Sequence, residues 1–189
     1  MSELDPARTA LLMVDLQEEY FLPGGPNELP AGPPALERAA GLLQRARQAG
    51  AHVIHVRHVS DHPLDEEFKA GSPRAEIRPE VAPLEGEPVI DKRMPSAFMG
   101  TPLEGLLRER GCETVIIAGF MTQMCCTATA HEAIGRRYRT LFASDATAAQ
   151  AYGPQAHGVV HERALENQRR LGAQVLPTPE IEALLSQTG

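Results

Sequence analysis

One cysteine of this chain lies where a thiol can become a nucleophile. Cys125 follows an apolar run at 114–118 that is typical of a buried strand, and Gly119 and Thr122 stand between the two. Thr122 is a residue type that caps helices, and as the N-cap it would make Cys125 the third helical position. Free backbone N–H groups and the positive end of the helix dipole favour an anion there, which lowers a thiol pKa. We therefore expect Cys125 to be a nucleophile, with a small buried core residue as the alternative.

Two ionisable residues end other predicted strands. Asp15 follows the apolar run 9–14, and Lys92 follows the short strand 88–91. Ligand sites in open parallel sheets gather at the carboxyl ends of the strands, so these residues and Cys125 can share one pocket. A carboxylate there can accept the thiol proton, and a lysine can keep that carboxylate ionised and stabilise developing charge. Each residue alone has a plainer interpretation, because Asp15 would also serve as a cap and Lys92 as a surface charge.

These residues need a sheet to bring them together, and the hydrophobic pattern predicts one. Short apolar runs alternate with helical patterns along the chain, which indicates a parallel sheet with helices on both faces. The predicted strands cover 9–14, 51–59, 88–91, 114–118, 140–144 and 173–176, and the predicted helices 35–50, 103–110, 122–137, 154–171 and 179–186. Proline-rich segments at 22–34 and 60–88 interrupt the pattern, and loops of that length are usually functional. We expect one domain over residues 1–189.

Composition excludes several classes of function. The formal net charge is −7 over 189 residues, whereas a nucleic-acid-binding surface needs a clustered basic face. No apolar run approaches the length of a membrane span, and residues 1–5 lack the basic and apolar regions of a signal peptide. Three cysteines, two of them adjacent, do not make a disulfide framework, so a reducing cytoplasm is expected. Neither Gly-x-Gly-x-x-Gly nor a P-loop occurs, and we predict no organic cofactor.

Three segments of the chain carry a family signature. The first is Asp15-Leu-Gln17 followed by the aromatic pair Tyr20 and Phe21, the second runs from Lys92 to Ser96-Ala-Phe98, and the third is Gly119-x-x-Thr122-x-x-Cys125 followed by Thr129-Ala130. In this order they resemble the isochorismatase-like cysteine hydrolases, which include nicotinamidases, carbamoylsarcosine amidases and ureidoacrylate amidohydrolases. The resemblance covers nearly the whole chain.

The resemblance implies a role for each of the three ionisable residues. Cys125 corresponds to the nucleophile, Asp15 to the general base and Lys92 to its charged partner. The family places a cis peptide bond after the motif glycine, which would be Phe120–Met121 here, and the N–H groups of Met121 and Cys125 would hold the oxyanion. It also implies a three-layer α/β/α fold, with a six-stranded parallel sheet in the order 3-2-1-4-5-6, and a dimer or tetramer.

Five further residues are candidate substrate contacts around the thiol, with plain core packing as the alternative for each: Gln17, Tyr20, Phe21, His58 and Phe98. Cys126 stands where the family usually has valine, and Cys112 approaches a strand, so both are expected to be buried core residues. His157 and His161 fall on one face of a predicted helix, and we expect them outside the pocket.

A metal site is the main alternative for the histidines after the second strand. Nicotinamidases carry an Asp-x-His there, but this chain has His58, Asp61 and His62 without that spacing. We therefore predict no metal and interpret these side chains as polar or substrate contacts. His131 lies six residues after Cys125, about 600° around a helix, so the two side chains diverge and do not form a dyad.

The sequence therefore predicts hydrolysis of a small amide or carbamoyl compound through a thioester on Cys125. The expected partners are this small molecule and further copies of the chain, with segment 60–88 as a candidate interface. Three alternatives stay open. An isochorismatase-type vinyl-ether hydrolase would not use the cysteine, a nicotinamidase would need a metal, and a non-catalytic binding relative would carry an unreactive thiol.

Overall fold

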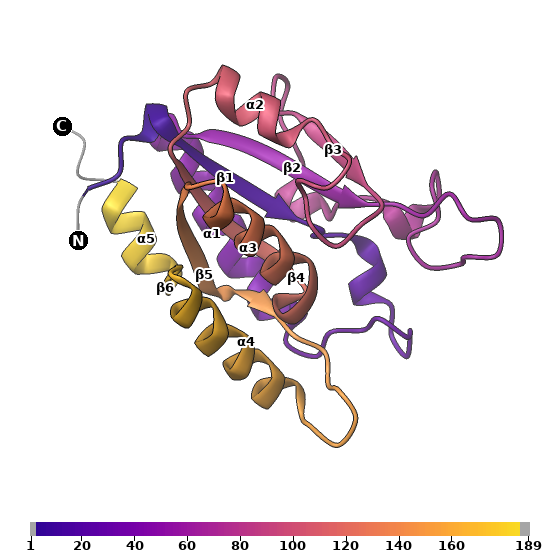
Figure 1. The fold of residues 1–189 in the computed structure, drawn as a ribbon. Helices are drawn as coiled ribbons and strands as arrows, with labels where there is room; N and C mark the ends of the chain where they lie inside the picture. Colours follow the sequence, from indigo (N-terminus) through magenta and orange to yellow (C-terminus); the bar gives the residue numbers. More distant parts are fainter. Residues whose placement is uncertain (1–2, 186–189) are drawn as a thin grey trace.

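A computed structural model describes residues 3–185 as a parallel sheet with helices packed on both faces (Figure 1). The six strands pair in the order β3-β2-β1-β4-β5-β6, which confirms the predicted order. The strands are β1 (Thr9–Val14), β2 (His52–His58), β3 (Val89–Lys92), β4 (Thr114–Phe120), β5 (Arg139–Ala148) and β6 (Gln174–Leu176). The helices are α1 (Gly32–Ala49), α2 (Leu103–Glu109), α3 (Thr127–Gly135), α4 (His157–Leu171) and α5 (Thr178–Leu185).

The two faces of the sheet bury two separate apolar clusters. Side chains of β1 alternate between them, with Leu11 and Met13 on one side and Leu12 and Val14 on the other. Helices α1 and α5 cover the first cluster, and α2, α3 and α4 cover the second. Figure 1 shows α3 and α4 in front of the strands and α1 behind them. Every residue of β1 is buried, which explains why its sequence is a continuous apolar run.

Several elements begin or end at different residues from those predicted. Helix α1 begins earlier, at Gly32, because the two prolines that follow fit the first helical turn, where no N–H is needed. Helix α4 begins later than predicted, at His157. Strands β4 and β5 continue to Phe120 and Ala148, past their predicted ends. The predicted end of the last helix, Ser186, lies outside the described residues.

The two proline-rich segments are joined by a buried carboxylate. Glu19 is fully buried and accepts hydrogen bonds from the Arg74 guanidinium at 2.8 and 2.7 Å and from the Asn27 amide at 3.1 Å. The second segment also contains two short 3-10 helices, Pro73–Ala75 and Pro79–Val81. The Glu19 contacts therefore fix the loops that follow the carboxyl ends of β1 and β2.

A glycine in β4 lets two central strands approach each other. Gly119 pairs with Val14 and has a φ of +130°, a backbone conformation that L side chains rarely adopt. A Cβ atom on Gly119 would lie 1.8 Å from the Val14 carbonyl oxygen. A cis peptide bond, Phe120–Met121, follows at the end of the strand. No side chain fits at Gly119, and this close contact aligns the ends of the strands that lead to Asp15 and Cys125.

We expect Gly119→Ala to destabilise the protein by more than about 3 kcal/mol, because it adds a backbone clash to a strained φ. Gly105→Ala is the matched control. Gly105 lies in α2 with no atom within 4 Å of an added Cβ, so alanine there should be neutral or stabilise by up to about 1 kcal/mol. Urea unfolding measures both variants, and equal stabilities would contradict the close approach of β1 and β4.

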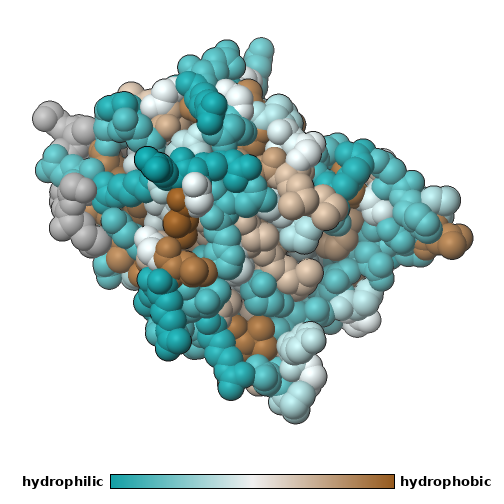
Figure 2. Space-filling model, viewed as in Figure 1, coloured by the Kyte–Doolittle hydropathy of each residue, from teal (hydrophilic) through white to brown (hydrophobic). Residues whose placement is uncertain are grey.

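The side of the molecule seen in Figure 2 is largely hydrophilic, with hydrophobic residues in small separate areas. Three methionines are about half exposed: Met94 and Met99 follow β3, and Met124 precedes Cys125. Among residues 3–185, no helix combines the length and the apolar character needed to cross a membrane.

Candidate active site

Asp15, Lys92 and Cys125 meet at the carboxyl edge of the sheet. Lys92 is the last residue of β3, and its Nζ lies 2.7 Å from Asp15 Oδ2 and 3.2 Å from Cys125 Sγ. Asp15 is 0% and Lys92 1% accessible, while Cys125 retains 7%. The structure thus brings together the three ionisable residues singled out in the sequence, as a buried ion pair with a thiol against its ammonium group.

Asp15 adopts an unusual backbone conformation just after β1. Its φ is +51°, in the left-handed region that favours glycine. Its N–H donates to the Val56 carbonyl oxygen at 2.9 Å, and its own carbonyl accepts from the Gln17 N–H at 2.9 Å. Such conformations cost about 1–3 kcal/mol and cluster at functional sites. The backbone of Asp15 is therefore held firmly at the point where its carboxylate meets Lys92.

Cys125 lies on a tight turn that differs from the predicted helix start. Residues Thr122–Cys126 form a π-helical turn, and α3 follows directly. Met121, not Thr122, is the N-cap, so Cys125 is the fourth residue of the turn rather than the third. Thr122 has the residue type of a cap, but its hydroxyl lies 2.9 Å from Nδ1 of His161 instead. Single π turns are rare and often occur at functional sites.

The surroundings raise the pKa of the Cys125 thiol to about 12. Burial contributes most, the Asp15 carboxylate adds to it by its charge and a hydrogen bond, and the Lys92 ammonium offsets them in part. The prediction that the helix start lowers this pKa is therefore wrong, because it left out burial and the neighbouring carboxylate. Burial lowers the pKa of Lys92, but its interactions with the Asp15 carboxylate and the Cys125 sulfur outweigh this effect and raise it, so Lys92 stays an ammonium ion.

The raised pKa predicts how the thiol reacts with an alkylating reagent. At pH 8 a thiol with a pKa of about 12 is about 10⁻⁴ thiolate, so alkylation of Cys125 by iodoacetamide should rise about tenfold per pH unit up to about pH 11. In Asp15→Asn the carboxylate charge is gone while Lys92 remains. The thiol pKa should then fall, and alkylation at pH 8 should quicken at least about tenfold. Peptide mass spectrometry measures these rates, and a plateau below pH 8 in the wild type would contradict the raised pKa.

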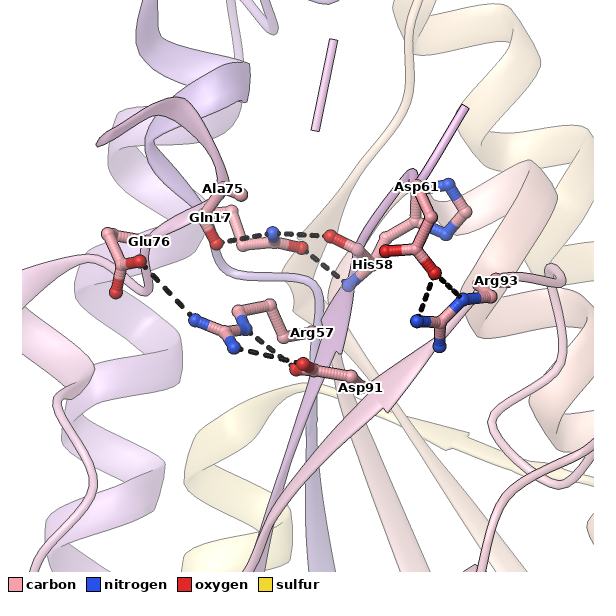
Figure 3. A network of polar contacts seen from close by, with 8 residues as sticks. All are labelled: Gln17, Arg57, His58, Asp61, Ala75, Glu76, Asp91 and Arg93. Atoms are coloured by element: carbon pink, nitrogen blue, oxygen red, sulfur yellow. Dashed lines mark hydrogen bonds and ion pairs between the residues drawn. The ribbon is translucent and has the colours of Figure 1, made fainter. Parts of the chain in front are cut away.

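Gln17, a predicted substrate contact, ties together the backbone around the site (Figure 3). Its Nε2 donates to the carbonyl oxygens of His58 at 2.8 Å and Ala75 at 2.7 Å, and its Oε1 accepts from the His58 N–H at 2.8 Å. The side chain is fully buried, and both its amide hydrogens and its oxygen are used inside the protein. Gln17 therefore holds the end of β2, and with it the His58 side chain, in place.

His58 lies between the ion pair and a cavity. Its Nδ1 is 3.4 Å from Lys92 Nζ, and its ring packs edge-on against Phe68 with the centroids 5.0 Å apart. Burial and the Lys92 charge lower the pKa of His58, so its imidazole is neutral at pH 7 and accepts from the ammonium group. The cavity has a volume of about 650 Å³ and is lined by Asn27, His58, Val59, Ser60, Asp61, His62, Asp65, Glu67, Phe68 and Arg93. Cavities of this size bind small molecules.

Arg93 and Phe68 are two of the cavity-wall residues that the sequence analysis did not single out. Arg93 directly follows Lys92 and is bonded to Asp61, as Figure 3 shows. The sequence offered one signal for Arg93, which is its position next to Lys92 at the end of a predicted strand. Phe68 offered no such signal, because its position against His58 depends on a long loop folding back over β2.

The three predicted aromatic contacts pack in different places. Tyr20 is buried and meets Phe68 edge-on with centroids 5.2 Å apart, so it supports the cavity wall from behind. Phe21 lines a separate cavity of about 480 Å³ beside α1. Phe98 stacks against Tyr138 at 6.2 Å. Of the three, Tyr20 is thus the one that packs against the wall of the cavity beside His58.

The residues considered for a metal site make separate contacts with different partners. Asp61 pairs with Arg93, and His62 Nδ1 lies 3.6 Å from Asp65. In the part of the chain that the structure describes, no three histidine, cysteine, aspartate or glutamate side chains gather in a way that could hold a metal ion. The side chains after β2 therefore build the polar wall of the cavity.

The other cysteines are buried packing residues, as predicted. Cys126 is fully buried and Cys112 is 8% accessible, and both lie in the apolar cluster under α2, α3 and α4. His131 is exposed on α3. His161 lines no part of the cavity beside His58, but it contacts the π turn.

Known proteins resemble this chain in both sequence and structure. The sequence matches a protein-family model described as the isochorismatase domain over residues 9–180. It is 37% identical to the maleamate amidohydrolase of Pseudomonas putida over 147 residues, which cover 71% of this chain and 69% of that protein. It is 29% identical to the ureidoacrylate amidohydrolase of Methylorubrum extorquens over 214 residues, with 96% and 84% of the two chains covered. A crystal structure of a cysteine hydrolase from Pseudomonas syringae pv. phaseolicola matches the fold with a TM-score of 0.92 at 27% identity, covering 98% of this chain and 96% of that one.

Proposed function

Because this chain belongs to the isochorismatase family, we propose that it is a cysteine-dependent hydrolase of a small amide or carbamoyl compound. One observation carries the proposal: a single buried ammonium group, Lys92 Nζ, contacts both Asp15 at 2.7 Å and Cys125 at 3.2 Å. A thiol, a base and a cation in mutual contact are the groups that amide hydrolysis through a thioester requires. Two relatives named as amidohydrolases support a C–N bond as the target.

In the first half-reaction, Cys125 Sγ attacks the substrate carbonyl carbon as Asp15 takes the thiol proton. A thiol with a pKa of about 12 does not ionise by itself at pH 7, so proton transfer to the carboxylate accompanies the attack. The C–N bond then breaks, and Asp15 gives the same proton to the leaving nitrogen. Ammonia or an amine departs, a thioester remains on Cys125, and Asp15 is again a carboxylate.

Water completes the reaction in the second half. Asp15 accepts a proton from a water molecule whose oxygen attacks the thioester carbonyl carbon. The C–S bond breaks, and Asp15 returns the proton to Cys125 Sγ, which releases a carboxylic or carbamic acid and restores the thiol. Lys92 stays an ammonium ion throughout and stabilises the carboxylate form of Asp15 between the proton transfers.

The carbonyl oxygen gains negative charge in both half-reactions. We assign its stabilisation to the backbone N–H groups of Met121 and Cys125, which belong to the N-cap and the first turn, where helical N–H groups lack carbonyl partners. His58 and Phe68 are the proposed contacts for the rest of the substrate, because both line the cavity next to the triad.

Ammonia release from a panel of small amides tests the proposed activity. Nicotinamide, maleamate, N-carbamoylsarcosine and ureidoacrylate are offered to the protein with and without a chelator. Release that the chelator does not affect supports the thiol mechanism. Release that the chelator abolishes and Zn²⁺ restores would favour a metal-dependent amidase, and hydrolysis of a vinyl ether in place of every amide would favour the isochorismatase-type alternative.

The charge of the cavity predicts a preference among substrates. Asp61, Asp65 and Glu67 line it, against one guanidinium, Arg93, which already pairs with Asp61. We expect kcat/KM for the cationic 4-aminobutanamide to exceed that for succinamate, an anionic amide of similar length, by about three- to tenfold at low salt. Glu67→Gln should narrow this ratio. A preference for succinamate would contradict the role of the acidic wall.

We also propose that the enzyme is cytoplasmic and self-associates as a dimer or tetramer. Its three cysteines are free, which suits a reducing compartment. Segment 60–88 exposes Leu64, and the half-exposed Met94 and Met99 add apolar surface that a second copy can cover. Light scattering during size-exclusion chromatography tests the assembly, and a monomeric mass at micromolar concentration would contradict it.

A further inference from the structure

The turn that carries Cys125 is held from outside by one helix, α4. Thr122 is the first residue of the turn and is fully buried, and its hydroxyl lies 2.9 Å from Nδ1 of His161 on α4. The side chain of the N-cap residue, Met121, caps no backbone N–H of the turn, and its sulfur accepts only from the Gln123 side chain, at 3.8 Å. The contact with His161 therefore fixes the end of the turn that a capping side chain usually fixes.

A second contact from α4 reaches Thr122 through its backbone. Thr127 Oγ1 donates to the Thr122 carbonyl oxygen at 2.6 Å, and Gln168 Nε2 donates to Thr127 Oγ1 at 3.0 Å. Gln168 is fully buried. His161 and Gln168 are two helical turns apart, so they lie on the same face of α4. Helix α4 thus contacts the Thr122 hydroxyl directly and the Thr122 carbonyl oxygen through Thr127.

His161 is in the right state to hold a hydroxyl. Burial lowers its pKa most, Glu162 and a backbone hydrogen bond with Ser144 raise it, and His157 lowers it again, so the imidazole is neutral at pH 7. A neutral imidazole offers one nitrogen as an acceptor. The hydrogen bond with the Ser144 backbone raises the pKa, so His161 donates it and uses its one N–H there. Nδ1 is then left to accept from the Thr122 hydroxyl.

We propose that His161 and Gln168 are positioning residues that set the place of the Cys125 thiol by clamping Thr122. Cys125 belongs to the same turn, so a shift of Thr122 moves Sγ away from Lys92 Nζ, which now lies 3.2 Å from it. A displacement of about 1 Å at a reacting group can cost about 100-fold in rate. The kinetic part of this inference rests on the proposed function, and the alkylation part does not.

Two variants remove opposite ends of the same hydrogen bond. His161→Phe removes the acceptor and keeps a ring, and Thr122→Val removes the donor and keeps the shape. We expect each variant to lower kcat about 10- to 100-fold, with KM within about twofold of the wild type. The kcat of the double variant should be no lower than that of the less active single variant, because both substitutions remove the same hydrogen bond. His161→Asn places an oxygen near the site of Nδ1 and should recover most of kcat, while His157→Phe should leave it unchanged. Wild-type kcat in both single variants would overturn the clamp.

A readout without substrate separates this inference from the proposed function. Without the clamp the turn opens more often, so alkylation of Cys125 at pH 9 should rise at least about threefold in His161→Phe and Thr122→Val, but not in His161→Asn or His157→Phe. If this pattern appears and no amide is hydrolysed, the positioning role stands and the assigned reaction fails. Equal alkylation rates in all four variants overturn the clamp even when amides are hydrolysed. Thr122→Ser keeps the hydroxyl, so its alkylation rate should match that of the wild type. If His161→Phe does not fold, comparing Thr122→Val with Thr122→Ser tests the same hydrogen bond.

Discussion

Replacing Cys125 by alanine should lower kcat for amide hydrolysis by at least about 10⁴-fold, because the thioester has no other sulfur on which to form. The fold should persist, since the residue is small and lies at the edge of the buried region with 7% of its surface accessible. Ammonia release by the variant, followed for hours against the wild type, measures the loss. Thermal unfolding of the same sample shows whether the structure is intact.

Cys126→Ala is the matched control for this variant. Cys126 is the next residue and fully buried, and its side chain packs in the apolar cluster under α3. Its loss should cost about 1–2 kcal/mol of stability through the small cavity left behind, with kcat within about threefold of the wild type. If Cys125→Ala instead keeps more than about a tenth of the activity, a thioester mechanism does not operate. A water molecule activated by Asp15 would then have to attack the amide directly.

Lys92→Met should abolish activity and also destabilise the protein. Lys92 is 1% accessible and pairs with the fully buried Asp15, so removing the ammonium group leaves a buried carboxylate without its counter-charge. Removing one partner of a buried ion pair lowers the free energy of unfolding by about 3–5 kcal/mol. We also expect kcat to fall at least about 100-fold, because the attack loses the cation that stabilises the negative charge passing between Cys125 and Asp15. Urea unfolding and ammonia release measure the two effects separately.

The double variant Asp15→Asn/Lys92→Met distinguishes stability from catalysis. It removes both buried charges, so its stability should return to within about 2 kcal/mol of the wild type, while it stays inactive without a base. Arg93→Met changes the exposed neighbour and should alter stability by less than about 1 kcal/mol. A single variant Lys92→Met as stable as the wild type would contradict the buried ion pair.

Much of the fold and the meeting of the triad could be predicted because they depend on neighbours in sequence. The strands β1 and β4 are continuous apolar runs, as expected for strands buried on both faces. Asp15 follows one strand and Lys92 ends another, and parallel strands place these ends on one edge of the sheet. The position of Cys125 shortly after β4 brings it to the same edge.

What could not be predicted depends on contacts between distant residues. Thr122 has the type of an N-cap, yet its hydroxyl is used by His161, 39 residues further along the chain. Tyr20 and Phe21 are adjacent aromatic residues that no local pattern distinguishes. The course of the chain places Tyr20 against Phe68 at the cavity wall and Phe21 in another cavity.

The pKa of the Cys125 thiol is the clearest case of a property that depends on distant residues. The helix start is a local feature and favours a thiolate, whereas the burial of Cys125 and the carboxylate of Asp15 come from the folded chain and prevail. The resting nucleophile is therefore a protonated thiol, which resists alkylation and oxidation. It loses its proton to Asp15 when Sγ attacks a substrate.

Trapping the thioester tests the covalent mechanism most directly. An amide that the enzyme hydrolyses is incubated with increasing hydroxylamine, and the peptide that contains Cys125 is analysed by mass spectrometry after an acid quench. A thioester mechanism predicts a hydroxamate that forms at the expense of the acid, and an acyl group on Cys125 in the sample quenched without hydroxylamine. Acid as the sole product at every hydroxylamine concentration, with an unmodified Cys125 peptide, would contradict a covalent intermediate on this residue.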